Sequence, residues 1–293
     1  MAPPAAPPVA GPFAAPVPGP EQPPAPPAVP EQPPAPTVVK DRRVLRAVLR
    51  WTAAVVVCAA VGTGAAYKIT QMDRTDVPGL ATRSDGRWDY PLLTRPPLPS
   101  GSPAPFAESN PAGAHYADLR ALLLPAPKGA KEDKALRGAD GWLDTGDFLA
   151  EYADESDRDA FRQKLVDDGL RHIAARGWTT GDGTRTRIYL LQFDTAAVVD
   201  ADLMSALFPY SSPVYPLRGA ETAESDEDFP AEIRVSGIDH SVYVEPAPYG
   251  DEQDREAYLG AGDVCAVIVQ SRKGGAPAVP FQQTVALQSE LLG

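Results

Sequence analysis

The longest uncharged apolar stretch of the chain lies near its N-terminus. Seventeen consecutive residues, from Trp51 to Tyr67, carry no charge. As a helix they would span roughly 26 Å, slightly less than the ~30 Å hydrocarbon core of a bilayer. Arg50 and Lys68 flank the stretch and can extend their charged ends to the membrane surface, where aromatic residues such as Trp51 and Tyr67 also gather. The pattern predicts a transmembrane helix over residues 44–68.

Basic residues around this stretch predict how the helix is oriented. Five lie just before it and two lie just after it: Lys40, Arg42, Arg43, Arg46 and Arg50, against Lys68 and Arg74. The positive-inside rule therefore places the N-terminus in the cytoplasm and the C-terminus outside the cell. Two alternatives stay open. One is a cleaved signal peptide, with small residues such as Gly64 and Ala66 near the cleavage site, and the other is a buried helix of a globular protein.

A helix over residues 44–68 implies a lipid bilayer as the first partner of the chain. Three arginines at helical spacing share one face just before the uncharged stretch, where they would meet anionic headgroups: Arg42, Arg46 and Arg50. Small residues four positions apart also offer a face for a homodimer of this helix: Ala60 with Gly64, and Cys58 with Gly62.

Beyond residue 114 the apolar positions predict helices and strands that alternate along the chain. Helical spacing and capping residues predict helices at residues 118–124, 144–152, 156–177, 195–208 and 279–292. Alternating or continuous apolar runs predict strands at residues 178–180, 184–193, 231–235, 241–245 and 263–271. The charged and polar segments between them are expected to be loops, among them residues 128–134, 209–227 and 250–255.

The order of these elements sets the expected fold class. Gly181-Asp-Gly183 joins the first two strands as a hairpin, and Ser156 with Asp159 begins the longest helix as a capping box. Residues 263–271 form the most apolar strand, which is expected to be central and covered on both faces. Residues 115–293 are therefore predicted to be an α+β domain, a mainly antiparallel sheet with helices packed against it.

Composition and charge differ on the two sides of the predicted membrane helix. Residues 1–36 contain sixteen prolines and are rich in alanine. They bury too little apolar surface to offset their ordering entropy, so residues 1–43 are expected to be a disordered cytoplasmic tail. Of the formal net charge of −12, residues 1–68 carry +3 and residues 69–293 carry −15. So acidic a domain repels phosphates, which argues against nucleic acid as a partner.

Residues 69–114 follow the predicted membrane helix and are rich in Pro, Gly, Ser and Asn. They are interpreted as an extracytoplasmic stalk or as an extended arm packed on the domain. Trp88, Tyr90 and the pair Leu92-Leu93 favour docking of part of this segment, because a free stalk has no need of large apolar side chains.

Three short motifs carry a resemblance to known proteins. They are Gly177-Trp-Thr-Thr-Gly-Asp-Gly183, Arg187-Ile-Tyr-Leu-Leu-Gln-Phe-Asp194 and Gly262-Asp-Val-Cys-Ala-Val-Ile-Val-Gln270. Over roughly residues 115–293 the chain resembles uncharacterised actinobacterial single-pass membrane proteins with an extracytoplasmic sensor-like domain, and more loosely the sensor domains of lipoproteins and receptor kinases. The resemblance implies an outward-facing domain that binds or senses something. It supplies no catalytic residue, and the paired cysteines of the sensor kinases are missing here.

Candidate catalytic residues are few. The chain has three histidines, His115, His172 and His240, and two cysteines, Cys58 and Cys265. Cys265 lies inside the most apolar predicted strand, where a cysteine behaves as a small hydrophobic residue with a raised pKa. His240 precedes a strand in an Asp-His-Ser turn and is expected to be exposed. Nothing in the sequence brings a cysteine or serine beside a histidine, so no catalytic residue is assigned.

Metal and phosphate sites have little support in the sequence. No Cys or His pair has the spacing of a zinc site. Asp140, Asp144 and Asp147 form a loose acidic cluster, but they do not follow the order of a calcium loop. The acidic run 221–228 is interpreted as a solvated loop, with weak calcium binding or a basic partner as the alternative. The turn at residues 181–183 is too short to cradle a phosphate. No metal site and no cofactor are assigned.

These observations favour a membrane-anchored extracytoplasmic module that binds, senses or scaffolds at the cell envelope, in which the outer domain takes a ligand or a protein partner. Two alternatives stay open. The first is an envelope hydrolase whose active site is assembled from residues distant in sequence. The second is an anchor whose Pro-rich tail recruits cytoplasmic partners, because residues 20–26 of that tail recur as residues 30–36.

The predicted topology can be tested with a reporter that is active only in the cytoplasm. Fused after Gly293, the reporter should be inactive, because the positive-inside rule places this end outside the cell. The same reporter fused before Met1 serves as the control and should be active. Strong activity of the C-terminal fusion would overturn the predicted orientation.

Overall fold

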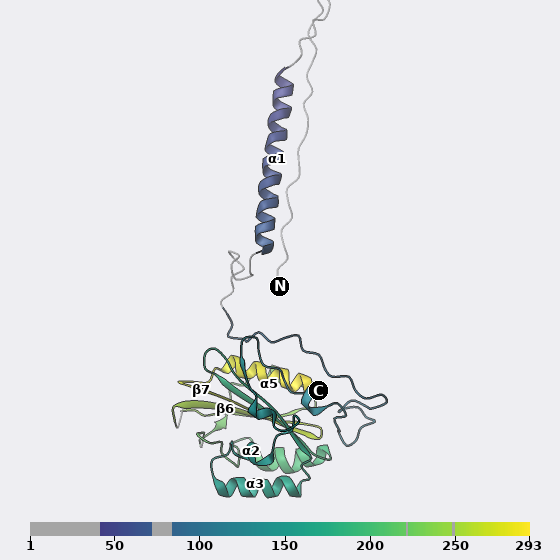
Figure 1. Ribbon diagram of the computed structural model, residues 1–293, viewed down its shortest axis with the longest axis vertical. Helices are drawn as coiled ribbons and strands as arrows, with labels where there is room; N and C mark the ends of the chain where they lie inside the picture. Colours follow the sequence, from purple (N-terminus) through teal and green to yellow (C-terminus); the bar gives the residue numbers. More distant parts are fainter. Residues whose placement is uncertain (1–41, 72–83, 221, 248–249) are drawn as a thin grey trace, which may run out of the picture. The chain divides into compact units, whose positions relative to one another are not determined.

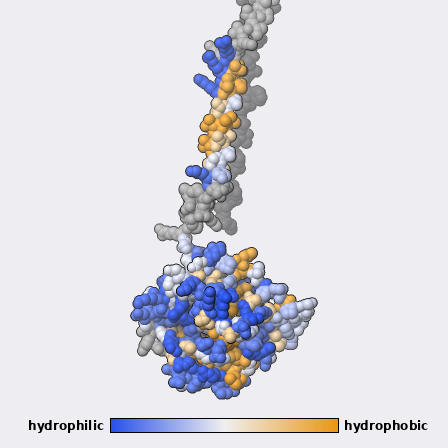
Figure 2. Space-filling view, viewed as in Figure 1, coloured by the Kyte–Doolittle hydropathy of each residue, from blue (hydrophilic) through white to orange (hydrophobic). Residues whose placement is uncertain are grey.

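The computed structural model describes residues 42–71, 84–220, 222–247 and 250–293, and the chain divides into two units, Met1–Pro78 and Gly79–Gly293. Residues 1–41 of the predicted tail, with its repeat, and residues 72–83 of the predicted stalk lie outside the described residues, whereas Arg42 and Arg43, assigned to the tail from the sequence, are helical. In the first unit, α1 (Arg42–Gln71) is one continuous helix, and its segment Val44–Lys68 is long and apolar enough to cross a membrane. Figure 2 shows the apolar surface of this helix between hydrophilic positions. The 25 residues span roughly 37 Å, so the helical flanks supply the length that the uncharged stretch lacks.

The second unit is built on one seven-stranded sheet in which every pair of neighbouring strands is antiparallel. In spatial order the strands are β1 (Lys131–Asp133), β2 (His172–Thr179), β3 (Arg185–Gln192), β7 (Val264–Lys273), β6 (Glu252–Ala261), β5 (Asp239–Val244) and β4 (Glu224–Ser225). The predicted α+β fold class is confirmed. The most apolar strand predicted from the sequence, now β7, is the central one.

Helices cover both faces of the sheet (Figure 1). On one face lie α5 (Ala278–Leu292) and the segment that precedes residue 130. On the other face lie α2 (Thr145–Leu149), α3 (Glu155–Asp167), the π-helical segment η4 (Val198–Met204) and α4 (Ser205–Leu207). Three short 3-10 helices complete the described part of the domain: η2 (Leu119–Ala121), η3 (Ala135–Arg137) and η5 (Ala231–Ile233).

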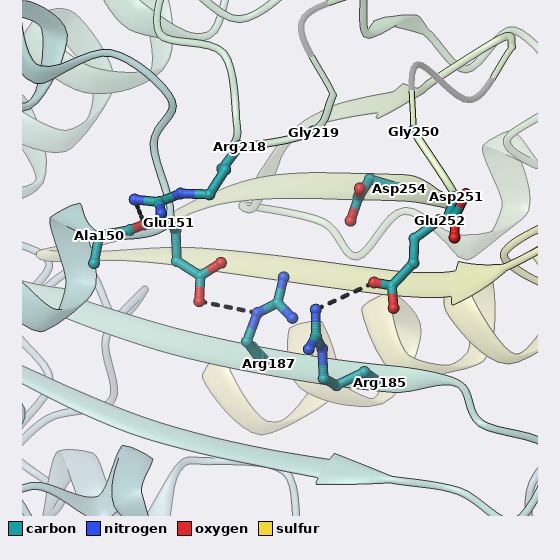
Figure 3. A pocket seen from close by; sticks show the side chains of 10 residues that line it. All are labelled: Ala150, Glu151, Arg185, Arg187, Arg218, Gly219, Gly250, Asp251, Glu252 and Asp254. Carbon is teal, nitrogen blue, oxygen red and sulfur yellow. Dashed lines mark hydrogen bonds and ion pairs between the residues drawn. The ribbon is translucent and has the colours of Figure 1, made fainter.

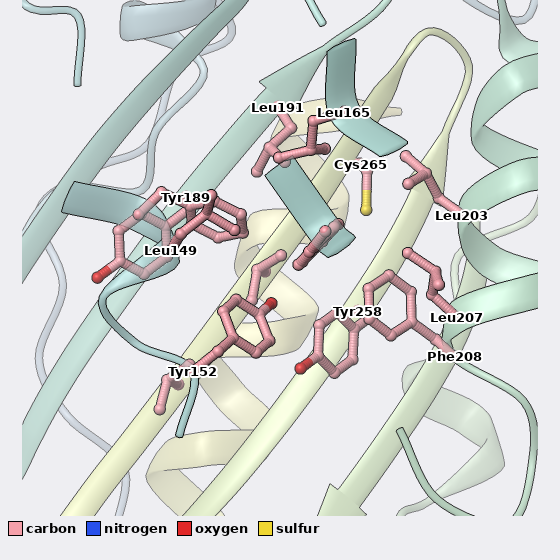
Figure 4. Close-up of a cluster of buried hydrophobic side chains, with 14 of the residues drawn as sticks. Leu149, Tyr152, Leu165, Tyr189, Leu191, Leu203, Leu207, Phe208, Tyr258 and Cys265 are labelled. Carbon is pink, nitrogen blue, oxygen red and sulfur yellow. The ribbon is translucent and has the colours of Figure 1, made fainter. Parts of the chain in front are cut away.

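Each face of the sheet has its own apolar core, because side chains alternate along the strands. On the α5 face, the buried Trp178 of β2 and Ile268 of β7 pack with Phe281 of α5. On the α2 face, the ring of Phe208 stacks on that of Tyr258 with centroids 3.6 Å apart (Figure 4). The sheet is therefore buried on both sides in its middle, which explains the continuous apolar sequence of β7.

The helix predicted over residues 156–177 is shorter than expected. α3 begins after Asp154 rather than at Ser156 and ends at Asp167, where Gly169 follows with a φ of 75° that closes the helix. Residues 172–179 instead form β2, which pairs with β3 along its whole length. The spacing of four that continued to Ile173 was a coincidence. Tertiary pairing, which supplies a full ladder of hydrogen bonds, overrides it.

Three further predictions about local structure were wrong. Residues 231–235 do not form a strand, because the N–H groups of Ile233 and Arg234 bond to carbonyls three residues earlier in the 3-10 turn η5. The loop predicted at residues 250–255 is largely strand, since β6 begins at Glu252. The loop predicted at residues 128–134 contains the short edge strand β1. Charged residues concealed both strands, because a run of charged residues is more typical of a solvated loop.

Residues 84–114 pack against the domain, as the docked-arm interpretation expected. Trp88, Tyr90 and Leu93 contact the core on the α5 face, and the ring of Tyr90 meets that of Trp178 edge-on at 6.4 Å. Leu92 departs from this expectation, because its side chain is exposed. Alternate residues of an extended segment point in opposite directions, so one of two neighbouring leucines faces water.

Two glutamines of α5 fasten the preceding chain to the domain. The side-chain oxygen of Gln283 accepts from the N–H of Trp88 at 2.8 Å, and its amide nitrogen donates to the carbonyl of the same residue at 2.9 Å. Gln288 repeats this pattern with the N–H of Leu124 and the carbonyl of Leu122, both at 3.0 Å. Each amide thereby satisfies two backbone groups that lie outside regular structure.

Replacing Gln288 by Leu is expected to lower the free energy of unfolding by about 2–4 kcal/mol, because the buried N–H of Leu124 and carbonyl of Leu122 would lose their partners. Urea denaturation of the full chain in detergent, followed by tryptophan fluorescence, measures the change. Gln282→Leu is the matched control on the same helix, because Gln282 is only half-buried. Equal effects of the two substitutions would contradict this account of Gln288.

Candidate functional site

The sheet face covered by α2 and α3 changes character along the strands. It is apolar in the middle and charged toward one end. Two consecutive cross-strand rows at that end run across β3, β7 and β6: Arg187–Val269–Glu256 and Arg185–Ser271–Asp254. In each row an arginine and an acid stand on either side of a small or apolar residue of the central strand. The register of the two ladders alone brings these residues together.

A cleft of about 400 Å³ opens over this charged end of the sheet (Figure 3). We call it the charged cleft. The strands β3 and β6 contribute two charged residues each, and the segments around α2, before β4 and before β6 close its sides. Its lining residues are Ala150, Glu151, Arg185, Arg187, Arg218, Gly219, Gly250, Asp251, Glu252 and Asp254. Three arginines and four acids thus share one small concave surface.

Ion pairs hold part of this charge in place. Nε of Arg187 lies 2.9 Å from Oε1 of Glu151, and the side chains are only 13% and 20% exposed. The same oxygen of Glu151 accepts a hydrogen bond from the Tyr189 hydroxyl at 2.5 Å. At the outer rim, Nη2 of Arg185 pairs with Oε2 of Glu252 at 3.2 Å, where both side chains are about half exposed. The inner pair is therefore the rigid one.

Arg218 reaches the charged cleft from the loop before β4. Its backbone N–H donates to the carbonyl of Glu151 at 2.8 Å, and its Nη2 donates to the carbonyl of Ala150 at 3.0 Å. These bonds fasten the loop to the segment after α2. Residues 150 and 218 are distant in the chain, so only the folded structure brings this arginine to the cleft.

Two acids of β6 have raised pKa values. Burial raises the pKa of Asp254 to about 6, against the opposing effect of the Arg187 charge. Glu256 lies one row deeper and is 1% exposed, and burial raises the pKa of its carboxyl to about 8. Its Oε2 accepts from the Tyr258 hydroxyl at 2.6 Å, while its Oε1 has no hydrogen-bond partner among the described residues. Burial thus favours the neutral form of the deepest acid beside the cleft.

His115 and Asp263 form a buried pair that resembles part of a catalytic triad. Nδ1 of His115 lies 2.7 Å from Oδ1 of Asp263. The other ring nitrogen, Nε2, lies 3.0 Å from the carbonyl oxygen of Leu292, so no ring nitrogen is left for a nucleophile. The pair ties residue 115 to the turn between β6 and β7 and to the end of α5. Its role is structural.

The expectation that His240 is exposed was wrong. β5 begins at Asp239, so His240 lies in a strand and is half-buried, and burial lowers the pKa of its ring. Its Nε2 lies 3.1 Å from Oγ of Ser289, a serine–histidine contact that the sequence did not indicate. The Ser289 hydroxyl is fully buried and donates to the carbonyl of Val285 at 2.9 Å. A substrate has no access to it.

The remaining candidates from the sequence have structural roles. Cys265 is buried in β7 as predicted, and burial raises the pKa of its thiol to about 12. His172 stacks on Trp142 with centroids 4.4 Å apart. Asp144 caps α2 by accepting from the N–H of Gly146 at 2.7 Å. Among the described residues, no group of three or more His, Cys, Asp and Glu is arranged to hold a metal ion.

The residues of the charged cleft were missed at the level of sequence. One signal was available: Arg185 and Arg187 alternate at the start of a predicted strand, and Asp254 and Glu256 alternate just before an apolar run. Charges at every second position of a strand share one face, so they indicate a charged sheet face. The arginines of β3 and the acids of β6 come together on one face of the sheet, on either side of β7. Local patterns do not predict this, because it depends on the order of the strands.

No protein-family model matches the chain, and no curated protein matches it. The resemblance expected from the three sequence motifs therefore has no independent support. All three motifs lie mainly in or beside β2, β3 and β7, the middle of the sheet. The functional argument rests on the geometry of the charged cleft.

Replacing Glu256 by Gln is expected to raise the free energy of unfolding at alkaline pH. The folded chain holds this proton up to about pH 8, whereas the unfolded chain loses it near the ordinary value of 4.5. Stability therefore falls as the pH rises through this window and stays low above it. Gln does not titrate and still accepts from Tyr258. We expect a gain on the order of 2 kcal/mol at pH 9 and little change at pH 4.

Urea denaturation of the full chain in detergent between pH 4 and pH 9 checks this prediction. The groups that face Glu256 are Asp254 and Tyr258 on its own strand, Tyr243 on β5 and Tyr152 after α2. Glu252→Gln is the matched control, because Glu252 is an exposed acid of the same strand. An unchanged pH dependence in the Glu256→Gln variant would contradict the assignment of the buried proton.

Proposed function

We propose that this chain is a membrane-anchored module of the cell envelope whose outer domain binds a small polar ligand in the charged cleft. In this proposal α1 spans the membrane with the N-terminus in the cytoplasm, and residues from Gly79 onward lie outside. The observation that carries the proposal is the cleft itself, a concave site that gathers three arginines and four acids on one end of a sheet face.

The properties of α1 support the role of an anchor. Its apolar segment Val44–Lys68 is fully exposed along the helix, as a lipid-facing surface must be. The hydroxyls of Thr52 and Thr63 donate to the carbonyls of Val48 and Ala59 at 2.8 Å and 2.7 Å. These polar groups are therefore satisfied within the helix, which a hydrocarbon environment requires. The basic residues before the helix support the orientation.

The energetics of the cleft support binding rather than a purely structural role. Burying charged or polar groups costs free energy, and apolar residues of similar volume would stabilise the same sheet face at least as well. The chain nevertheless keeps the half-hidden pair of Arg187 and Glu151 and the buried acid Glu256 at one end of an otherwise apolar face. Costly polar groups that converge on a cleft are typical of ligand sites.

The motifs that resemble extracytoplasmic sensor domains are compatible with this proposal. One of them contains Arg187, so the strand that carries the resemblance also carries a residue of the cleft. The hydrolase alternative would need a histidine beside an acid or a reactive hydroxyl that a substrate can reach. Neither His115, which contacts Asp263, nor His240, which contacts Ser289, meets this need. His115 uses both ring nitrogens inside the domain, and the serine beside His240 is buried.

Binding in the charged cleft can be tested by a screen of polar small molecules that includes amino acids, organic acids, sugars and nucleosides. Thermal unfolding of the full chain in lipid nanodiscs reports compounds that stabilise it, because a ligand that binds only the folded state raises the melting temperature. Any such compound should bind Arg218→Ala at least tenfold more weakly. Arg218 is exposed and bonded only to backbone carbonyls, so its loss should leave the fold intact.

Arg162→Ala is the matched control, because Arg162 is an exposed arginine of α3 paired with Asp159 and outside the cleft lining. Compounds that bind the cleft should stabilise this variant as they stabilise the unaltered chain. The proposal fails if no compound stabilises the chain, or if every stabilising compound binds Arg218→Ala as tightly as the unaltered chain.

A further inference from the structure

The two strands that line the charged cleft carry opposite charge. β3 contributes Arg185 and Arg187, and β6 contributes Glu252 and Asp254. The two strands are not neighbours, because β7 lies between them. Two inter-strand spacings, roughly 10 Å, therefore separate the backbone of the basic wall from that of the acidic wall. At the outer rim the side chains of Arg185 and Glu252 bridge the two walls at 3.2 Å.

The strand between the two walls carries no charge in the two rows nearest the cleft. There β7 contributes Val269 and Ser271, whose uncharged side chains are buried. The next residue of β7 on this face, Lys273, pairs with Asp251 at 2.9 Å at the exposed rim. The cleft therefore has a basic side on β3 and an acidic side on β6, and in these two rows no charged residue of β7 stands between them.

Each wall keeps hydrogen-bonding capacity that the described residues leave unused. Arg187 pairs with Glu151 through Nε, and its Nη1 reaches Oγ of Ser271 only at 3.4 Å. Arg218 bonds through one nitrogen to a backbone carbonyl and to no acid in the described part of the chain. On the other wall, the carboxyl of Asp254 makes no hydrogen bond or ion pair with the described residues, although it is largely buried. Figure 3 shows Arg187 and Asp254 on different strands of the same cleft.

We propose, resting on the function proposed above, that the ligand of the charged cleft is a zwitterion, with an acidic group held by Arg187 and Arg218 and an amino group held by Asp254. A ligand with both charges satisfies both walls at once. An anion alone would leave the largely buried Asp254 carboxyl covered by the bound molecule without a partner. A cation alone would leave unused the nitrogens of Arg187 and Arg218 that no acid of the described residues occupies. A ligand with only one charge would bind more weakly, because it leaves charged groups of the cleft without a partner, and this difference in affinity makes the site specific.

Three probes with the same five-carbon chain test the charge requirement. They are 5-aminopentanoate, which carries one charge of each sign, pentanedioate, which carries two negative charges, and 1,5-diaminopentane, which carries two positive charges. Ligand-detected NMR on the full chain in lipid nanodiscs measures their binding. We expect 5-aminopentanoate to bind at least tenfold more tightly than either of the other two.

The distance between the charges is tested with the series of ω-amino acids from two to six carbons. Because the walls are fixed by the sheet, affinity should pass through a maximum at one length. The N-acetyl and methyl ester derivatives of the best member, each of which lacks one charge, should bind at least tenfold more weakly than the parent.

Two variants assign each end of the probe to a wall. In Asp254→Asn the parent amino acid and its N-acetyl derivative should bind equally well, while the penalty for the methyl ester remains. In Arg218→Ala the penalty for the methyl ester should shrink instead, while that for the N-acetyl derivative remains. A general loss of folding would weaken all probes alike and would not produce these opposite patterns.

The possible failures are distinguishable. Two outcomes would overturn the zwitterion and leave the function proposed above intact. In the first, the dianion or the dication binds more tightly than 5-aminopentanoate. In the second, no ω-amino acid binds, while a compound of another class binds in a way that Arg218→Ala weakens. If no compound of any class binds in a way that Arg218→Ala weakens, both proposals are wrong.

Discussion

The pairing of β7 with β3 on one side and β6 on the other is the interaction on which the rest of the domain depends. Eight residue pairs join β7 to β3, and ten join it to β6. Most of β7 is buried on both faces, so its hydrogen bonds are shielded from water and its side chains contribute to both cores. The antiparallel ladders fix which residues of the two outer strands stand opposite each other. Both cores and the charged cleft follow from that register.

Register matters because a strand alternates its side chains between two faces. A shift of one residue along β6 would turn Tyr258 and Glu256 away from the α2 face and bring Ala257 and Leu259 into their place. The same shift would remove Asp254 from the cleft. Stability of the apolar middle and geometry of the polar end are therefore set by one constraint. The apolar contacts, which are the more numerous, hold the charged residues where they are.

The domain treats its buried polar groups in two different ways. At Gln283, Gln288 and the pair of His115 with Asp263, the polar atoms find partners that tie distant segments to α5. Near the charged cleft, Glu256 keeps an oxygen without a partner among the described residues. The first group stabilises the fold, because each bond satisfies a group that would otherwise be buried alone. The second destabilises it, and this cost is the physical basis for proposing a binding role.

Local patterns in the sequence determined the apolar helix, the hairpin of β2 and β3, the central strand and the last helix, because hydrophobic periodicity and turn residues act over short distances. They also indicated the burial of Cys265. The extent of α3, the location of His240 and the existence of β1 were decided by tertiary structure, since pairing partners overrule local preference. The charged cleft belongs to this second class, although alternating charges in β3 and β6 indicated a charged sheet face. Glu151, Arg187, Arg218 and Asp254 become neighbours only through strand order and loop packing, which no short stretch of sequence encodes.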